Sequence, residues 1–280
     1  QPFGSTVSLS SGSASSIATT GLNAGEHTYY ADFLGDANNN ASSTLPVANF
    51  TIAKNDTSIA VVSSNASSVY GQPIQLTATV DEIVPSVVTP VGNVQFYFNG
   101  AEIGSPVALD EGVALSADLH TLVPPEYLLA DHIVVGEYTF SAEYLGNSNS
   151  VGSISSVEDQ VITPAATEVT ISSSENPSVY GTNLNMTIKV TQQTESLTIP
   201  TGQVQLWIDG VKFLTSLPLN GDGEAVRSVP YLNLWPGVHA VTAYYTPSSP
   251  IQFVASDNTG ENEPLDRKST RLNSSHESPS

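Results

Sequence analysis

The sequence predicts an all-β protein in which two-layer β-sandwiches are repeated along the chain. Segments in which every second residue is apolar or aromatic indicate strands with one buried face. Glycine-containing turns separate these segments at short intervals, as in sandwich folds. One such segment recurs three times, at 25–35, 136–146 and 237–247. Three copies of one strand imply three copies of one domain.

The recurring strand reads GEHTYYADFLG, then GEYTFSAEYLG, and finally, more weakly, GVHAVTAYYTP. Two further motifs give the repeat length: SVYG at 68–71 returns at 178–181, and PVGNVQFYFNG at 90–100 returns as PTGQVQLWIDG at 200–210. Both shifts are 110 residues, which is the size of a whole domain rather than of a solenoid unit. We therefore predict a partial domain at 1–55, complete domains at 56–164 and 165–264, and a tail at 265–280.

The middle copy predicts about seven strands. In chain order they cover residues 57–63, 73–80, 93–98, 101–109, 113–119, 136–146 and 157–162. Asn99-Gly100 is expected to form a hairpin turn because both residues tolerate positive φ, and Asp209-Gly210 takes its place in the third copy. From Gly100 to Gly136 is 36 residues, against 27 in the third copy, so nine extra residues are expected within 122–135, with a helical turn at 126–130.

The first copy is incomplete. It supplies a hairpin (6–10 and 13–20), the recurring strand and a closing strand at 46–53, but not the first three strands. Half a sandwich leaves one apolar face uncovered, which is not a stable arrangement. We expect residues 1–55 to fold poorly by themselves. Because the chain opens at Gln1 without methionine, we interpret it as an internal piece of a longer reading frame.

Composition excludes several classes of function. There is no cysteine, so disulfides, thiolate metal sites and cysteine catalysis are absent. The net charge of −20 disfavours binding to phosphate backbones and anionic membrane surfaces, so no nucleic-acid partner is expected. No apolar run reaches eighteen residues, and we expect no membrane insertion.

The three recurring motifs, in this order, resemble the bacterial immunoglobulin-like repeats of the third group. The resemblance covers nearly all of residues 1–264 and departs from the pattern at Thr246–Pro250. It implies tandem immunoglobulin-like sandwiches in large exported bacterial proteins, often attached to the cell surface, with neighbouring repeats as partners and no catalytic residues. Residues Asp266–His276 resemble, codon by codon, a translated sequencing-adapter oligonucleotide, so we expect 265–280 to be disordered or artefactual.

Candidate chemistry in the sequence is sparse. His27 and His239 occupy the repeat position that Tyr138 fills in the middle copy, which favours a ring tucked at the strand start over a catalytic base. His120 and His132 lack a Ser-Asp arrangement, and no catalytic motif occurs. We therefore predict no enzyme activity, no catalytic residue and no cofactor.

Two binding hypotheses stay open. Asp32 and Asp36, near Asn38–Asn40, offer oxygen ligands for Ca²⁺, although the ordered calcium-loop motif is missing and solvated turn residues are the alternative. Tyr97 and Trp207 are out of phase with the inward residues of their strands and could stack on sugars. The alternative is ordinary surface or interdomain packing.

The function predicted from these observations is a non-catalytic structural or adhesive stalk of a large exported bacterial surface protein. The expected location is extracellular or at the cell surface. Two alternatives are a module that binds an unknown surface glycan or protein, and an accessory region of a secreted hydrolase.

Overall fold

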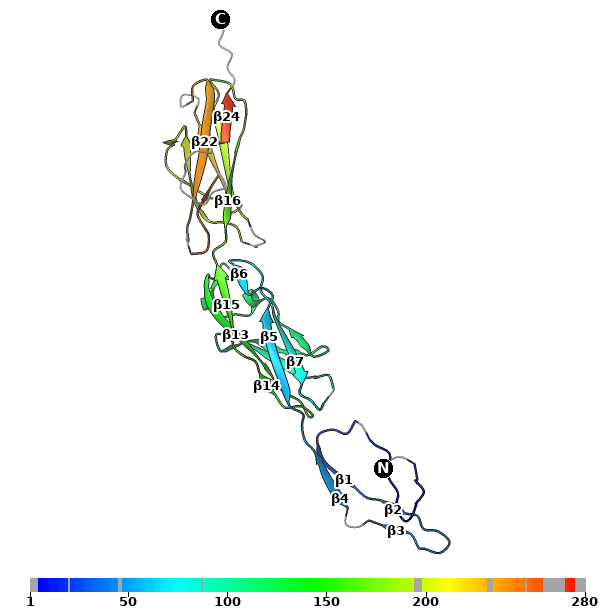
Figure 1. Cartoon of the computed structure of the whole chain (residues 1–280). Helices are drawn as coiled ribbons and strands as arrows, with labels where there is room; N and C mark the ends of the chain where they lie inside the picture. Colours follow the sequence, from blue (N-terminus) through cyan, green and yellow to red (C-terminus); the bar gives the residue numbers. More distant parts are fainter. Residues whose placement is uncertain are drawn as a thin grey trace.

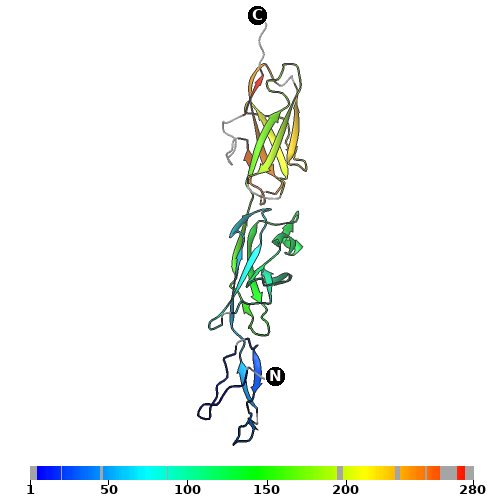
Figure 2. The ribbon, with the colours of Figure 1, turned by 90° about the vertical axis from the view of Figure 1, so that its right-hand side faces the viewer.

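Three β-rich units follow one another along the molecule in a computed structural model of the chain. The N-terminus lies in the unit at one end and the C-terminus at the other end (Figure 1), and a quarter turn shows the same succession (Figure 2). The structure describes residues 5–19, 21–44, 47–86, 88–193, 198–230, 234–249 and 251–258, and the backbone alone of 270–274. Within these ranges the helical elements are two 3₁₀ turns, Leu119–Thr121 and Pro125–Tyr127.

The second domain consists of two sheets, as predicted. One sheet has the order β10-β7-β5, and the other has β6-β15-β13-β8-β9 with β14 beside β13. The strands are β5 (Thr57–Ser63), β6 (Ser67–Val69), β7 (Leu76–Glu82), β8 (Asn93–Phe98), β9 (Ala101–Ala108), β10 (Val113–Leu115), β13 (Gly136–Tyr144), β14 (Ser153–Ile154) and β15 (Glu158–Thr163). The first predicted strand therefore continues into β6, which crosses to the second sheet and pairs in parallel with β15.

The third domain repeats this arrangement. Its sheets have the orders β16-β17-β21 and β19-β18-β22-β23, with β20 beside β18 and β24 beside β22. The strands are β16 (Thr167–Ser173), β17 (Leu184–Gln192), β18 (Gly202–Ile208), β19 (Val211–Lys212), β20 (Leu217–Pro218), β21 (Glu224–Val229), β22 (Gly237–Pro247), β23 (Ser256–Asp257) and β24 (Thr270–Ser274).

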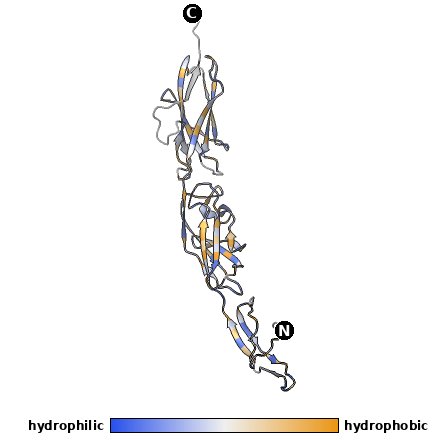
Figure 3. Cartoon of the chain, turned by 45° about the vertical axis from the view of Figure 1, so that its right-hand side comes forward, coloured by the Kyte–Doolittle hydropathy of each residue, from blue (hydrophilic) through white to orange (hydrophobic). Residues whose placement is uncertain are grey.

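Each complete domain has its own apolar core between its sheets, and Tyr70 of the second domain joins the core cluster of the third. In β13 the inward residues Tyr138, Phe140, Ala142 and Tyr144 are all buried, and in β22 so are Val241, Ala243 and Tyr245. Orange hydrophobic positions are interspersed with blue hydrophilic ones along the strands (Figure 3). The alternation in the sequence therefore gave the correct buried face.

The hairpin turns also follow the prediction. Asn99 and Gly100 have φ angles of 48° and 78°, and Asp209 and Gly210 have 51° and 75°. Positive φ at both central residues is the geometry that suits a right-twisted two-residue hairpin. The side-chain oxygen of the first turn residue is used as well, because Asn99 Oδ1 accepts the Thr139 N–H at 2.9 Å and Asp209 Oδ1 accepts the Ala240 N–H at 2.8 Å.

The first unit has four short strands that pair two by two. It contains β1 (Gly25–Tyr29), β2 (Asp32–Phe33), β3 (Ser42–Ser43) and β4 (Ala48–Ile52), with β1 paired to β4 and β2 to β3. None of its described residues is buried, and Tyr29 and Tyr30 are 56% and 61% exposed. The hairpin predicted at 6–20 is reduced to one bridge between Ser10 and Ser13. Tyr29 lies beside the ring of Phe50, with centroids 6.0 Å apart, but both rings stay exposed.

The nine-residue insertion differs from its prediction. The helical turn expected at 126–130 lies at Pro125–Tyr127, and a small hairpin of β11 (Leu128–Leu129) and β12 (His132–Ile133) follows it. Proline at the first position of the turn fixes its start. Ala130 and Asp131 then adopt φ of 49° and 64°, which reverses the chain instead of extending a helix.

Five residues of the segment for which disorder was predicted, Thr270–Ser274, form β24 against β22. In this pair Gly237 lies opposite Ser274 and Val241 opposite Thr270. β13 and β15 pair in the same register, with Gly136 opposite Ile162 and Phe140 opposite Glu158. The prediction of a disordered tail is therefore wrong for these five residues. An unpaired strand edge accepts backbone hydrogen bonds from nearly any sequence, so the pairing does not depend on the origin of the tail, and the adapter interpretation stays a prediction.

Candidate functional site

The two aromatic residues considered for sugar stacking occupy equivalent places on different domains. Tyr97 in β8 lies opposite Ser141 and Glu102, and Trp207 in β18 lies opposite Thr242 and Lys212. Both side chains are half-buried. The structure does not bring them together, so any ligand contact would be made by one ring at a time.

The Tyr97 hydroxyl is engaged within the sheet. It donates to Glu143 Oε2 at 2.8 Å, and this bond together with burial raises the pKa of Tyr97 to about 12. A tyrosine whose hydroxyl is held by a carboxylate presents only part of its ring to solvent. The role of Tyr97 and Trp207 in binding stays a prediction.

The histidines at the start of the recurring strand share one contact with the tyrosine that replaces them. His27 Nε2 lies 2.8 Å from the Asn23 carbonyl oxygen, the Tyr138 hydroxyl donates to the Val134 carbonyl at 2.9 Å, and His239 Nε2 lies 2.6 Å from the Trp235 carbonyl oxygen. In each copy the ring reaches back four residues. This shared contact explains why histidine and tyrosine interchange here.

His239 makes a second polar contact that the other copies lack. Its Nδ1 lies 2.7 Å from Asp209 Oδ2 in the adjacent hairpin turn. Burial alone would lower the pKa of His239, but the hydrogen bonds to Asp209 and to the Trp235 carbonyl raise it. Burial would likewise raise the pKa of Asp209, yet the bonds from His239 and the Ala240 N–H lower it. With acceptors at both ring nitrogens, the charged imidazolium fits this position best.

His120 and His132 come together at the insertion. Their ring centroids are 5.1 Å apart, and His120 Nδ1 contacts Asp118 Oδ1 at 2.8 Å. Burial and the neighbouring His120 lower the pKa of His132. Within the part of the chain that the structure describes, no group of three or more His, Asp or Glu side chains could hold a metal ion.

The acidic loop of the first unit uses its carboxylate for the backbone. Asp36 Oδ1 accepts the N–H groups of Asn38 and Asn39 at 2.8 Å, and these contacts lower the pKa of Asp36. In the second domain Asn147 Oδ1 accepts from Asn149 and Ser150 in the same way. Asp32 contacts Ser43. Asp36 and Asn147 therefore make the same turn contact, which either side chain can provide. Ca²⁺ binding stays a prediction.

The clearest built sites in the molecule are the two joints between units. At the second joint the linker residue Ala165 is bonded into the third domain: its N–H donates to the Gln252 carbonyl at 2.8 Å, and the Val254 N–H donates to its carbonyl at 3.0 Å. Asn55 does the same at the first joint, with Asn149 and Val151 both at 2.8 Å. Each linker residue therefore forms an isolated parallel bridge with the domain that follows, Asn55 with Ser150 and Ala165 with Phe253.

The end of the second domain packs against the third-domain segment that pairs with this linker, through an aromatic contact. Tyr70, only 3% exposed, meets the ring of Phe253 edge-on with centroids 5.4 Å apart, and its hydroxyl donates to the Leu129 carbonyl at 2.8 Å. Val69 and Val135 border the same cluster, which continues into the third-domain core. The insertion supplies Leu129 and so supports Tyr70 from behind.

The first joint is polar where the second is apolar. The Ala24 N–H donates to Asn149 Oδ1 at 2.9 Å, Asn149 Nδ2 donates to Asn23 Oδ1 at 3.1 Å, and Lys54 Nζ reaches the Asn147 carbonyl at 2.6 Å. The partial unit lacks the strands that would carry a counterpart of Tyr70. The contacts at the two joints were not predicted from the sequence, although SVYG at 68–71, which contains Tyr70, was visible as a repeated motif.

Comparison with known families decides the classification. The model of the bacterial Ig-like domain (group 3) matches residues 61–163 and 171–261, more than half of the chain. The chain belongs to the group 3 bacterial Ig-like family. Both matches of this family fall on the two complete sandwiches, and the family prediction made from the three motifs is confirmed.

Several solved structures are similar to parts of this group 3 Ig-like chain. They include the Yersinia pseudotuberculosis adhesin InvE (12% identity, 71% of this chain and 57% of that chain, TM-score 0.29). They also include the D0-D1 domain of intimin (14% identity, 71% of this chain and 93% of that chain, TM-score 0.25). A third is the I9-I11 tandem of titin (12% identity, 84% of this chain and 72% of that chain, TM-score 0.29). The chain thus spans just over half the length of the InvE chain. No curated protein matches it.

Proposed function

We propose that this chain is a non-catalytic spacer, a stalk region of a large exported bacterial surface protein that holds a functional head away from the cell. Membership of the group 3 bacterial Ig-like family supports a structural or adhesive role and an extracellular or surface location in general. Similarity to the adhesin InvE is compatible with that role. No helix within the described ranges is long and apolar enough to cross a membrane.

The observation that carries the proposal is the construction of the second joint. Each linker is bonded into the following domain, so no free peptide separates the two sandwiches. Tyr70 and Phe253 then form an apolar contact across the boundary. A joint of this kind limits bending between the two domains. A spacer must resist bending in order to hold the head at a fixed distance. The acidic, lysine-poor surface favours solubility over self-association.

Removing the aromatic contact tests the proposal. Tyr70→Ala deletes the ring at the joint, and we expect small-angle X-ray scattering to report a smaller maximum dimension and a broader distribution of shapes than for the unaltered chain. Tyr180→Ala is the matched control, because Tyr180 is the equivalent residue at the exposed far end of the third domain and is 43% exposed. Identical scattering from the unaltered chain and Tyr70→Ala would argue against a stiff spacer.

The competing proposal is a carbohydrate- or protein-binding module. Its support is the placement of Tyr97 and Trp207 on outward sheet faces. Saturable binding on a glycan array or in a protein pull-down that is lost in Trp207→Ala, with the unfolding transition unchanged, would favour the module over the spacer. An accessory role in a secreted hydrolase would require a catalytic domain elsewhere in the same protein.

A further inference from the structure

Four rings lie in a continuous row from the insertion of the second domain to the third domain. The ring centroids of His120 and His132 are 5.1 Å apart, those of His132 and Tyr70 are 5.9 Å apart, and each pair meets edge-on. Tyr70 then meets Phe253 edge-on, with centroids 5.4 Å apart. We call these four residues the joint row. It connects two histidines of the insertion to the contact that holds the second joint.

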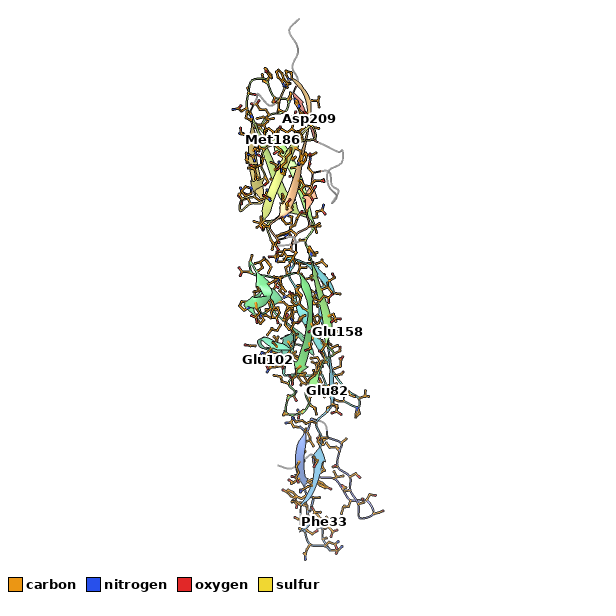
Figure 4. All side chains as sticks on the ribbon, turned by 90° about the vertical axis from the view of Figure 1, so that its left-hand side faces the viewer. Phe33, Glu82, Glu102, Glu158, Met186 and Asp209 are labelled. Carbon is orange, nitrogen blue, oxygen red and sulfur yellow. The ribbon has the colours of Figure 1, made fainter. Side chains whose placement is uncertain are left out.

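The insertion supports Tyr70 through two contacts that belong to one hairpin. Leu129 and His132 lie opposite each other in the β11–β12 pair. The Leu129 carbonyl accepts the Tyr70 hydroxyl at 2.8 Å, and the His132 ring meets the Tyr70 ring. A displacement of this hairpin would therefore remove both supports at the second joint, which lies between the domain of Glu158 and that of Met186 (Figure 4).

His132 fits the joint row as a neutral imidazole. Its Nδ1 atom is buried, and no group in the described part of the chain forms a hydrogen bond with it. A neutral ring can keep this nitrogen unprotonated, whereas an imidazolium carries an N–H there that would be buried without an acceptor. Leaving a buried donor unsatisfied costs free energy, and the cost is larger for a charged group. Protonation of His132 therefore disfavours the packed arrangement.

The charged and titratable groups around His132 come from its own hairpin turn, the first 3₁₀ turn and the end of β6. Burial has the largest effect and lowers the pKa of His132, and the neighbouring His120 lowers it further. Asp131 and Asp118 raise this pKa by less, and Asp118 Oδ1 already lies 2.8 Å from His120 Nδ1. Burial raises the pKa of Tyr70, which therefore stays uncharged. His132 is thus neutral at neutral pH and gains its proton below the ordinary pKa of 6.5.

We propose that the joint row is a pH-sensitive switch in which protonation of His132 displaces the β11–β12 hairpin, removes the support of Tyr70 and lets the second and third domains bend. This inference rests on the proposed spacer function and makes the stiffness of the spacer depend on pH. Because the pKa of His132 is lowered in the folded protein, its stabilising contribution is present above 6.5 and is lost as pH falls through the lowered value. The joint is therefore stiff at neutral pH and flexible in acid.

Pulsed electron paramagnetic resonance between two spin labels measures bending at this joint in the full chain. Because the chain has no cysteine, Ser105→Cys and Ser172→Cys provide one attachment site in each domain, both at exposed positions. We expect the distance distribution to be broader at about pH 5 than at about pH 7.5, the range in which a histidine changes charge. Circular dichroism at both pH values verifies that the domains stay folded.

Three variants separate the titration of His132 from its packing. His132→Phe keeps a ring in the row but accepts no proton, so its distribution should stay narrow at both pH values. His120→Gln removes a group that lowers the pKa of His132 and should shift the broadening to higher pH. His239→Tyr is the matched control, because His239 contacts Asp209 and Trp235 rather than the joint row, and it should leave the broadening unchanged.

Several outcomes would overturn the switch. One is equal broadening in the unaltered chain and in folded His132→Phe. Another is an unchanged distribution in acid although an NMR titration shows that the His132 ring is protonated. If His132→Phe is broad at both pH values, the shift in His120→Gln decides, and its absence overturns the proposal.

The spacer proposal is tested separately at neutral pH by Tyr70→Ala. Unchanged scattering in that variant would remove the spacer function itself. A change in scattering there, together with a distance distribution that does not respond to pH, would remove only the switch.

Discussion

At the residue scale, one ring at the start of each recurring strand reaches the carbonyl four positions earlier, whether that ring is His27, Tyr138 or His239. The sequence predicted a tucked ring here rather than a catalytic base. It could not predict the carbonyl partner, because that depends on how the preceding loop folds over the strand. Nor could it predict the Asp209 contact of His239, which joins residues 30 positions apart across a hairpin.

The His239–Asp209 pair makes the stability of the third domain depend on pH. The pKa of His239 is raised in the folded protein. Its contribution to the free energy of unfolding is therefore fully present below the ordinary histidine pKa of 6.5, and is lost as pH rises through the raised pKa. We expect the third domain to be less stable at about pH 9 than at about pH 5, by no more than about 1 kcal/mol because Asp209 is half-exposed.

Tryptophan fluorescence during urea unfolding measures this effect, since both tryptophans lie in the third domain. His239→Tyr, the residue type of the middle copy, is the matched variant and should flatten the pH profile. Asp209 has a lowered pKa, so its own contribution falls away only in acid, as pH drops through that lowered value. Equal pH dependence in the unaltered chain and His239→Tyr would rule out the pair as the cause.

At the scale of elements, the strands with strict alternation were predicted with the right face, and the short pairings were not. β6 has only three residues, and its place beside β15 is set by parallel pairing with a strand some 90 residues away. The insertion became a 3₁₀ turn and hairpin because Tyr127 and Leu128 could pack on the core of the second domain. Such choices depend on contacts that no local pattern encodes.

Gly202, at the start of β18, is a sharp test of how closely two strands approach. Its φ is +147°, and a Cβ there would overlap the carbonyl oxygen of Thr246 in β22. We expect Gly202→Ala to destabilise the third domain by more than about 1 kcal/mol, because backbone rather than a mobile side chain must move. Gly221→Ala is the control, as its Cβ would meet nothing within 4 Å. The tryptophan-detected urea midpoint measures both, and equal midpoints would refute the steric account.

At the scale of the whole molecule, the two joints differ in the chemistry that they use. The first is held by Asn23, Asn149 and Lys54 through exposed hydrogen bonds, each worth little net free energy in water. The second buries Tyr70 against Phe253. We therefore infer that bending is easier between the first and second units than between the second and third.

Residues 1–55 should not fold cooperatively by themselves. Their described residues bury no side chain, and the stacked His27–Phe50 pair, with centroids 5.4 Å apart, lies on the surface. Without the opposing sheet, the apolar face gains too little burial to offset the entropy of ordering the chain. A calorimetric melt of this segment is expected to lack a peak, whereas residues 56–280, the matched control, should retain one. A cooperative transition from the segment alone would contradict the half-sandwich account.

The sequence by itself determined the fold class, the tandem order and the buried face of the long strands, because alternation of period two is a local property that survives in any environment. It also determined the family, through three motifs in a fixed order. Only the tertiary structure decided that each linker is bridged to the next domain, that Tyr70 crosses a domain boundary and that its counterpart Tyr180 is exposed. Those outcomes depend on which surfaces meet in space. Tyr70 is buried because Phe253 packs against it, whereas Tyr180, at the same repeat position, is 43% exposed.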